Sequence, residues 1–170
     1  MNANINIDSR HFSLTEREVV ALGLWPSFAR LDHRARHFLG GTEVEGRDIL
    51  EVGCGNGAFL IWCWAQGAKR CVGIEPEADG SKSGASNIFE NAIQRLGCSH
   101  EVQLLRSRLE ELYTNDVGSF DVILLYNVIN HLDENACERI KEDPPAREVY
   151  VDAFRNLGRL VRRHGKVIIA

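Results

Sequence analysis

Short apolar segments alternate with segments of helical periodicity along most of this chain. The predicted strands are rich in Val, Ile and Leu, and they span residues 48–52, 70–75, 101–105, 120–126 and 166–170. Helices are predicted over 58–65, 79–96 and 149–163, and a helical region precedes the first strand over 13–39. Apolar strands of this kind are covered on both faces. The alternation predicts an α/β fold, a doubly wound parallel sheet with right-handed crossovers and N-terminal helices.

The turn after the first predicted strand is rich in glycine. Residues 51–58 read Glu-Val-Gly-Cys-Gly-Asn-Gly-Ala, and a helix is predicted to begin at Ala58. Glycine permits tight-turn dihedrals, and it lets a ligand lie against main-chain N–H groups at a helix N-terminus. The loop therefore predicts a site for a nucleotide-like cofactor. Glu51 would place a carboxylate in this site, which favours a cationic amine over a pyrophosphate and so S-adenosylmethionine over NAD.

A second acid follows the second predicted strand. In a doubly wound sheet the ligand lies over the carboxyl ends of the strands. Glu75 comes eighteen residues after Gly57, about the spacing at which an acid accepts hydrogen bonds from two ribose hydroxyls. The glycine loop alone also satisfies the looser dinucleotide fingerprint. The combination of the loop with Glu51 and Glu75 is more specific.

From Arg47 to Ala170 the sequence resembles the class I S-adenosylmethionine-dependent methyltransferases. Residues 49–57 look like the first motif of that family, 73–76 look like its second motif, and 119–132 are similar to its fourth-strand motif. The resemblance implies a Rossmann-like sheet that binds S-adenosylmethionine. It divides the chain into an N-terminal helical segment, 1–46, and a methyltransferase domain, 47–170.

The resemblance implies roles for individual residues. Glu51 would engage the amino end of the methionine part, Glu75 would hold the ribose, and Pro76 would press on one face of the adenine. Asn127 would face the methionine part or the acceptor. The cofactor is also expected to contact the residues of the glycine loop, namely Gly53, Cys54, Gly55, Asn56 and Gly57.

After the third predicted strand the sequence departs from the family pattern. The family often has Gly-Asp there, with the Asp meeting the adenine amino group, whereas this chain has Ser107, Arg108 and Leu109. A guanidinium group only donates hydrogen bonds, so the Arg108 side chain cannot accept one from adenine. We therefore expect adenine to contact backbone groups around Arg108 and Leu109, or the site to be weakened.

Two features of the C-terminal half set further expectations. Residues 133–148 contain the sequence Lys-Glu-Asp-Pro-Pro and are predicted to form a surface loop. The family's sheet normally continues with two further strands, whereas this sequence ends at Ala170. We therefore expect a C-terminally incomplete domain whose apolar edge, residues 167–169, leads to self-association.

Histidines are the candidates for acid–base and metal chemistry. His131 is the candidate catalytic residue, because an imidazole could remove a proton from an acceptor hydroxyl. The alternative for His131 is packing and backbone hydrogen bonding at a helix start. His33 and His37 lie four residues apart, as metal ligands can, but the Arg-rich stretch between them offers no third ligand. No metal site is predicted.

Composition bounds the class of protein. The net charge of −4 disfavours a general nucleic-acid or anionic-membrane binder, which would need a surplus of Lys and Arg. Five cysteines without a CxxC pair indicate reduced thiols and a cytoplasmic protein. No apolar run approaches the ~20 residues of a membrane span, so neither export nor a membrane anchor is expected.

The predicted function is methyl transfer from S-adenosylmethionine to an oxygen, nitrogen or carbon nucleophile on a small molecule. In-line displacement needs chiefly alignment and removal of water. One alternative is a degenerate or truncated domain that binds cofactor or a partner without catalysis, which Arg108 and the missing strands favour. The other is an NAD(P)-dependent oxidoreductase, which Glu51 disfavours.

Overall fold

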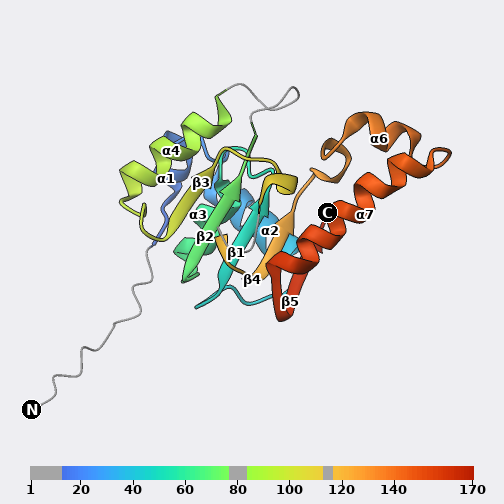
Figure 1. The fold of residues 1–170 in the computed structure, drawn as a ribbon. Helices are drawn as coiled ribbons and strands as arrows, with labels where there is room; N and C mark the ends of the chain where they lie inside the picture. The colour runs from blue at the N-terminus through green and yellow to red at the C-terminus, as the bar shows by residue number, and fades with distance from the viewer. Residues whose placement is uncertain (1–12, 77–83, 113–116) are drawn as a thin grey trace, which may run out of the picture.

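Five parallel strands form a single sheet at the centre of the protein (Figure 1). The computed structural model describes residues 13–76, 84–112 and 117–170. The strand order is β3-β2-β1-β4-β5. The strands are β1 (Asp48–Val52), β2 (Arg70–Ile74), β3 (Val102–Leu105), β4 (Phe120–Leu125) and β5 (Val161–Ile169). From β1 the chain adds β2 and β3 on one side and then β4 and β5 on the other side. This change of side places a topological switch point at the carboxyl ends of β1 and β4. The predicted doubly wound α/β fold is confirmed.

Four helices cover one face of the sheet and share a hydrophobic cluster with it. These helices are α1 (Glu16–Ala21), α2 (Phe28–Leu39), α3 (Ala58–Ala65) and α4 (Ala85–Leu96). Ile49 and Leu124 point from the sheet into this cluster, where they meet the almost wholly buried α3. The predicted start of α4 at residue 79 lies outside the described residues. The division into segments 1–46 and 47–170 stays a prediction, although α1 and α2 pack into the same cluster as the sheet.

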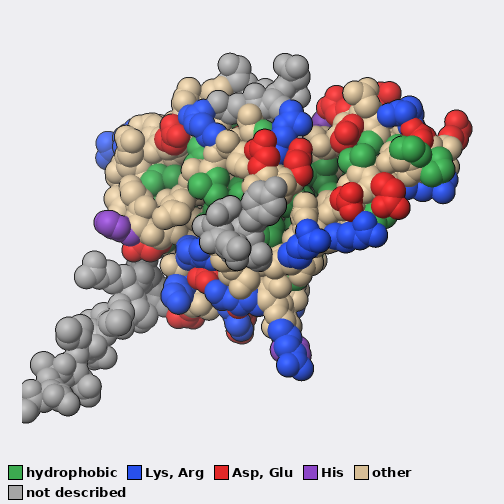
Figure 2. Space-filling model, in the orientation of Figure 1, with side chains coloured by type: hydrophobic (Ala, Val, Ile, Leu, Met, Phe, Trp, Pro, Cys, Tyr) green, Lys and Arg blue, Asp and Glu red, His purple; other side chains and the backbone are tan. Residues whose placement is uncertain are grey.

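The opposite face is covered by the short helix η1 (Leu109–Glu111) and the C-terminal half of α7 (Pro144–Leu160). Leu157 and Leu160 of α7 pack with Leu50 and Ile123 of the sheet. The N-terminal half of α7 pairs with α6 (Glu134–Arg139) in an arm that projects from the body of the molecule (Figure 1). Figure 2 shows hydrophobic side chains at the surface of this arm, between acidic and basic ones.

The arm corrects the prediction of a loop over residues 133–148. Asp133 caps α6 and accepts a hydrogen bond from the Ala136 N–H at 2.8 Å. Asp143 is the N-cap of α7, and Pro144 is its first residue. A proline is well tolerated there, because the first N–H groups of a helix have no intrahelical partner. The two prolines thus begin a helix rather than mark a loop.

The start of β5 also differs from the prediction. The helix was expected to reach residue 163, whereas α7 ends at Leu160 and β5 begins at Val161. The Arg162 guanidinium binds the carboxylates of Asp48, at 2.5 Å, and Asp121, at 2.7 Å, at the amino ends of β1 and β4. These ion pairs draw the residue into the sheet. A register shift opposite residues 120–122 accommodates the early pairing.

Within the described ranges, none of the helices has the length and apolar character that a transmembrane span needs.

Candidate functional site

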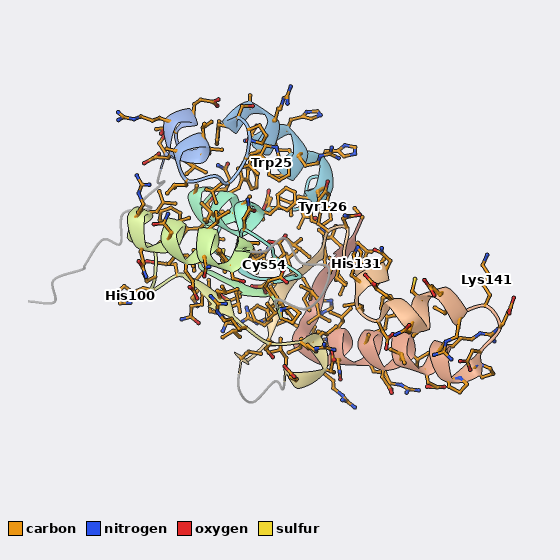
Figure 3. All side chains as sticks on the ribbon, turned by 90° about the horizontal axis from the view of Figure 1, so that it is seen from above. Trp25, Cys54, His100, Tyr126, His131 and Lys141 are labelled. Atoms are coloured by element: carbon orange, nitrogen blue, oxygen red, sulfur yellow. The ribbon has the colours of Figure 1, made fainter. Side chains whose placement is uncertain are left out.

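The segments that follow β1, β2 and β4 meet at the carboxyl edge of the sheet. Figure 3 looks down on this edge and labels Cys54, in the loop after β1, together with Tyr126 and His131, which follow β4. Glu75 comes directly after β2. The predicted site residues of these three segments are therefore brought to one edge of the fold, at the switch point where doubly wound sheets bind their ligands.

The glycine loop has two tightly packed positions and one open position. A Cβ atom added at Gly53 would lie 2.3 Å from Val128 Cγ2, and one added at Gly57 would lie 2.1 Å from the Phe89 ring. At Gly55, where φ is +53°, an added Cβ would meet no atom of the described residues within 4 Å. Gly53 and Gly57 are therefore required by packing. Gly55 leaves its backbone open to a ligand.

Two buried acids lie beside the loop. Glu51 is 3% exposed, and its Oε2 has no hydrogen-bond partner among the residues that the structure describes. Burial, and then the nearby Glu75 charge, raise the pKa of Glu51 well above its ordinary value. Glu75 is 6% exposed, and its Oε2 accepts a hydrogen bond from the Gly55 N–H at 2.9 Å. The second acid thus shapes the loop at its open position, while the first leaves a buried oxygen unsatisfied.

Cys54 is a packing residue in this loop. A Cβ atom added at Gly73 would lie only 2.5 Å from the Cys54 Sγ, so the thiol packs closely against β2. Burial, followed by the charges of Glu51 and Glu75, raises the pKa of Cys54 well above its ordinary value. A buried thiol that stays protonated is a poor nucleophile. A contact between the cofactor and the main chain of Cys54 stays a prediction.

Asn56 connects the glycine loop to the N-terminal helices. Its Nδ2 donates hydrogen bonds to the carbonyl oxygens of Gly23 at 3.1 Å and Leu24 at 2.8 Å. Its Oδ1 accepts one from the Ala58 N–H at 3.3 Å, in the first turn of α3. The side chain of Asn56 is thus engaged in holding the loop, and the predicted cofactor contact would use its main chain.

The residues expected around the adenine are less favourably placed. Pro76 is exposed directly after Glu75, and residues 77–83 lie outside the described residues. The Arg108 N–H already donates to Glu111 Oε2 at 2.8 Å, and the Leu109 side chain packs in the core at 3% exposure. Neither the Arg108 N–H nor the Leu109 side chain is therefore available to adenine. The contact remains a prediction for the other main-chain atoms of Arg108 and Leu109.

An aromatic cluster that sequence reasoning missed lies beside the end of β4. The Tyr126 ring contacts those of Phe59 and Phe38, with centroids 4.8 Å and 5.1 Å away. Asn127 follows at φ +51°, and its N–H donates to the Ala170 carbonyl oxygen at 2.7 Å. Asn is one of the few residues that adopts the left-handed region readily. The cluster and this hydrogen bond together set the exposed Asn127 at the switch point.

His131 forms a dyad with an acid that the sequence analysis did not single out. Its Nδ1 lies 2.8 Å from Glu134 Oε1, and its Nε2 lies 3.2 Å from Asn130 Nδ2. A carboxylate only accepts hydrogen bonds, so Nδ1 carries the proton in this arrangement. In the neutral ring Nε2 is then the acceptor. The spacing of three residues between His131 and Glu134 is the signal that could have revealed the pair.

Among the described residues, no group of three His, Cys, Asp or Glu side chains could hold a metal ion. The His33 and His37 rings lie stacked, with centroids 6.4 Å apart.

The site fits a ligand with particular chemical features. The open backbone at Gly55 admits a flat or extended group against the loop. The unsatisfied oxygen of Glu51 calls for a donor, and a buried acid is best paired with a cation. Glu75 is a strong acceptor for hydroxyl groups at the end of the neighbouring strand. A nucleoside that carries an ammonium group has these three features.

A family model described as "Methyltransferase domain" matches residues 27–170 of this chain. The match covers the whole sheet together with α2, and therefore begins earlier than the resemblance at Arg47.

Curated proteins with similar sequences include two bacterial enzymes. The tRNA U34 carboxymethyltransferase of Aliivibrio salmonicida is 31% identical over 111 residues, which is 63% of this chain and 30% of that protein. The tRNA U34 carboxymethyltransferase of Shewanella baltica is 33% identical over 111 residues, 63% of this chain and 29% of that protein. The matched part of this chain thus corresponds to less than a third of either relative.

Solved structures share the fold at low sequence identity. A methyltransferase structure from Methanococcus maripaludis, described as putative and S-adenosylmethionine-dependent, has a TM-score of 0.61 and 14% identity, covering 90% of this chain and 59% of that one. An S-adenosylmethionine-dependent methyltransferase from Mesorhizobium loti has a TM-score of 0.55 and 20% identity, covering 81% and 53%. At these identities the likeness shows the fold.

Proposed function

Because this chain belongs to the methyltransferase-domain family, we propose that it binds S-adenosylmethionine at the glycine loop and transfers the methyl group to a nucleophile. Membership agrees with the class and the cofactor that the two motifs predicted. One observation carries the proposal for this site: the buried Glu51, which lies two residues before the first glycine of the loop, has an oxygen without a hydrogen-bond partner among the described residues. An apolar or pyrophosphate ligand would leave that acid without a partner.

The residues of the site would divide the work of holding the cofactor. S-adenosylmethionine supplies a methyl group made electrophilic by a sulfonium. Glu51 would pair with the amino end, and Glu75 would accept hydrogen bonds from the ribose while it keeps the Gly55 N–H. Asn127 would face the methionine part or the acceptor. Binding of this kind supplies alignment and excludes water, which methyl transfer chiefly needs.

His131 is the proposed base for an acceptor that must lose a proton. Glu134 would hold Nδ1–H, and Nε2 would exchange its hydrogen bond from the Asn130 amide for the proton of an acceptor O–H or N–H. The resulting imidazolium would be stabilised by the Glu134 carboxylate. In this scheme His131 touches the acceptor, and Glu134 is a positioning residue.

Calorimetric titration with S-adenosylhomocysteine, S-adenosylmethionine and NAD tests the proposal. Both sulfur nucleosides should bind, and NAD should not. Glu75→Gln keeps an oxygen for the Gly55 N–H but loses the charge, so affinity for S-adenosylhomocysteine should fall by about tenfold, or ~1.4 kcal/mol. The exposed Glu45, at the other end of the fold, gives the matched control Glu45→Gln, which should bind normally. Binding of NAD alone would contradict the proposal.

For the acceptor, we propose a small molecule first and RNA second. The net charge of −4 supports a small acceptor, because RNA binding draws on a surplus of cations. The names of the curated relatives, which are tRNA U34 carboxymethyltransferases, favour RNA. Transfer of a labelled methyl group into purified total tRNA, compared with a protein-free metabolite extract, separates the two. Cofactor binding without transfer to either would favour a non-catalytic domain.

A further inference from the structure

Glu51 is a buried acid for which the described residues supply no counter-ion. It belongs to β1, directly before the glycine loop in the sequence, and 3% of its surface is exposed. In residues 13–76, 84–112 and 117–170, Glu51 forms no ion pair with a Lys, Arg or His side chain, and its Oε2 receives no hydrogen bond. An isolated carboxylate removed from water in this way is costly, and the usual response is to keep the proton.

The titratable groups around Glu51 reinforce this cost. Glu75 faces it from the end of β2, and the charge of Glu75 raises the pKa of Glu51, in addition to the larger effect of burial. In turn, the Glu51 charge contributes to raising the pKa values of three thiols from the loop, α3 and β2, namely Cys54, Cys63 and Cys71. From β4, the residue paired with Glu51 is the apolar Leu124. Among the described residues, the titratable neighbours of Glu51 are thus one carboxylate and three thiols, and none of them carries a positive charge.

We propose that Glu51 is a neutral carboxylic acid in the ligand-free protein and ionises when the ammonium group of the cofactor binds, so that cofactor capture releases a proton. The inference rests on the proposed function, because it takes the ligand to be S-adenosylmethionine or its product. On binding, the Glu51 O–H bond breaks, its electron pair stays on the carboxylate, and the proton leaves to solvent. The carboxylate then pairs with the ammonium group.

The proton on Glu51 lets the site distinguish ligands that carry an ammonium group from ligands that do not. A ligand without an amine gains nothing from ionising Glu51, so it binds with the acid neutral and leaves the proton count unchanged. A ligand with an ammonium group supplies the missing counter-ion. Its affinity should rise as pH rises, by up to about tenfold per pH unit, as long as the pH is below the pKa of Glu51 in the ligand-free protein. The reason is that binding is linked to the loss of one proton. Proton release therefore distinguishes the amino-acid end of the cofactor from its nucleoside end.

Calorimetry in buffers of different ionisation enthalpy measures the proton directly. The folded chain is titrated with S-adenosylhomocysteine at pH 7.0, where the ligand's amine is largely charged. The slope of observed enthalpy against buffer ionisation enthalpy should correspond to the release of up to one proton, and the number released should increase when the titration is repeated at lower pH, down to about pH 5.5. 5′-Methylthioadenosine, which keeps the nucleoside and lacks the amino acid, should give a slope near zero.

A matched variant assigns the proton to Glu51. Glu51→Gln keeps the shape of the side chain but has no proton to release, so binding of S-adenosylhomocysteine should be weaker and the slope should vanish. Retained binding of 5′-methylthioadenosine would show that the variant is folded. If the variant does not fold, the carboxyl carbon shifts of labelled glutamate in the original chain report the same ionisation by NMR.

The outcomes separate this inference from the function on which it rests. S-adenosylhomocysteine binding without proton release, or an undiminished slope in Glu51→Gln, would overturn the inference and leave the cofactor proposal standing. Failure of both nucleosides to bind would overturn the cofactor proposal, and the proton-linked capture with it.

Discussion

At the scale of single residues, two glycines of one loop have different roles. Gly57 has φ +71° and faces the Phe89 ring, so any side chain there would both strain the backbone and collide with α4. Gly55 has a positive φ as well, but its Cβ position is open. Gly57 is therefore needed for folding, and we expect Gly55 to be needed chiefly for the proposed ligand.

Alanine substitutions should separate the role in folding from the role in ligand binding. Gly57→Ala should cost about 2–5 kcal/mol of unfolding free energy, the sum of backbone strain and overpacking. Gly55→Ala should cost only about 1–2 kcal/mol from strain. It should nevertheless weaken S-adenosylhomocysteine binding by about tenfold or more, since the new methyl group occupies the open face of the loop. Urea unfolding and calorimetry measure the two effects, and equal losses of stability would contradict the division.

The buried Glu51 should also make the free energy of unfolding depend on pH. Unfolded Glu51 ionises near pH 4.3, whereas the folded protein holds the proton to higher pH because burial raises the pKa of this group. The unfolded state thus binds fewer protons above pH 4.3, and stability falls as pH rises, by up to about 1.4 kcal/mol per unit until the folded pKa is reached. Glu51→Gln should lack this fall. Urea unfolding from pH 5 to 8 measures it, with Glu45→Gln as the control that keeps it.

At the scale of secondary-structure elements, an ion-pair network joins three strands at the edge opposite the site. Arg162 of β5 bridges Asp48 of β1 and Asp121 of β4, and the Asp48 N–H donates to Asp121 at 2.9 Å. Burial alone would raise the pKa of Asp121, but the hydrogen bonds from Asp48 and Arg162 outweigh it and lower this pKa. The network explains where β5 begins.

Removing the arginine should destabilise the sheet. Among the described residues, Arg162→Met leaves the buried Asp48 with only the Arg70 guanidinium, 3.8 Å away, so we expect a loss of about 1–3 kcal/mol in unfolding free energy. The adjacent, exposed Arg163 offers the control Arg163→Met, with an expected change within about 0.5 kcal/mol. The Arg162 effect should shrink as pH falls below the ordinary pKa of an aspartate, about 3.9, and it should be lost at the lower pH at which folded Asp121 is protonated, since Arg162 helps to lower the pKa of Asp121. Equal effects of the two variants would contradict the role of the network.

At the scale of the whole molecule, β5 leaves one edge of the sheet uncovered. Among the described strands β5 pairs only with β4, and its Val167 and Ile169 side chains are 38% and 43% exposed. Unpaired apolar edges are templates for strand pairing with another chain. The exposure of this edge supports the self-association predicted from the sequence, which stays a prediction.

A charge on this edge should prevent association. The original chain should form dimers or larger species as its concentration rises, and Val167→Lys should shift it toward monomer, because a lysine on an edge strand opposes pairing. Val20→Lys, at a side chain 50% exposed on α1, is the control for added charge and should associate as the original does. Sedimentation velocity measures the distribution. A monomeric original chain at high concentration would contradict the prediction.

Local sequence determined the centre of the fold and the outline of the site. The bounds of β1 and α3 were predicted to the residue, because a short apolar run, a glycine turn and a continuous apolar helix are signals contained in neighbouring residues. The same holds for the spacing that puts Glu75 at the end of the next strand. These features depend on backbone sterics and hydrophobic periodicity, which act over a few residues.

Only the tertiary structure decided which partners these residues meet. Arg162 enters a strand because Asp48, more than a hundred residues earlier, lies opposite it, and the Asn56 amide is occupied by carbonyl groups of the N-terminal segment. The unsatisfied oxygen of Glu51 is likewise a property of the packed core. Burial and charge pairing depend on contacts between distant parts of the chain, and the periodicity of a sequence carries no record of those contacts.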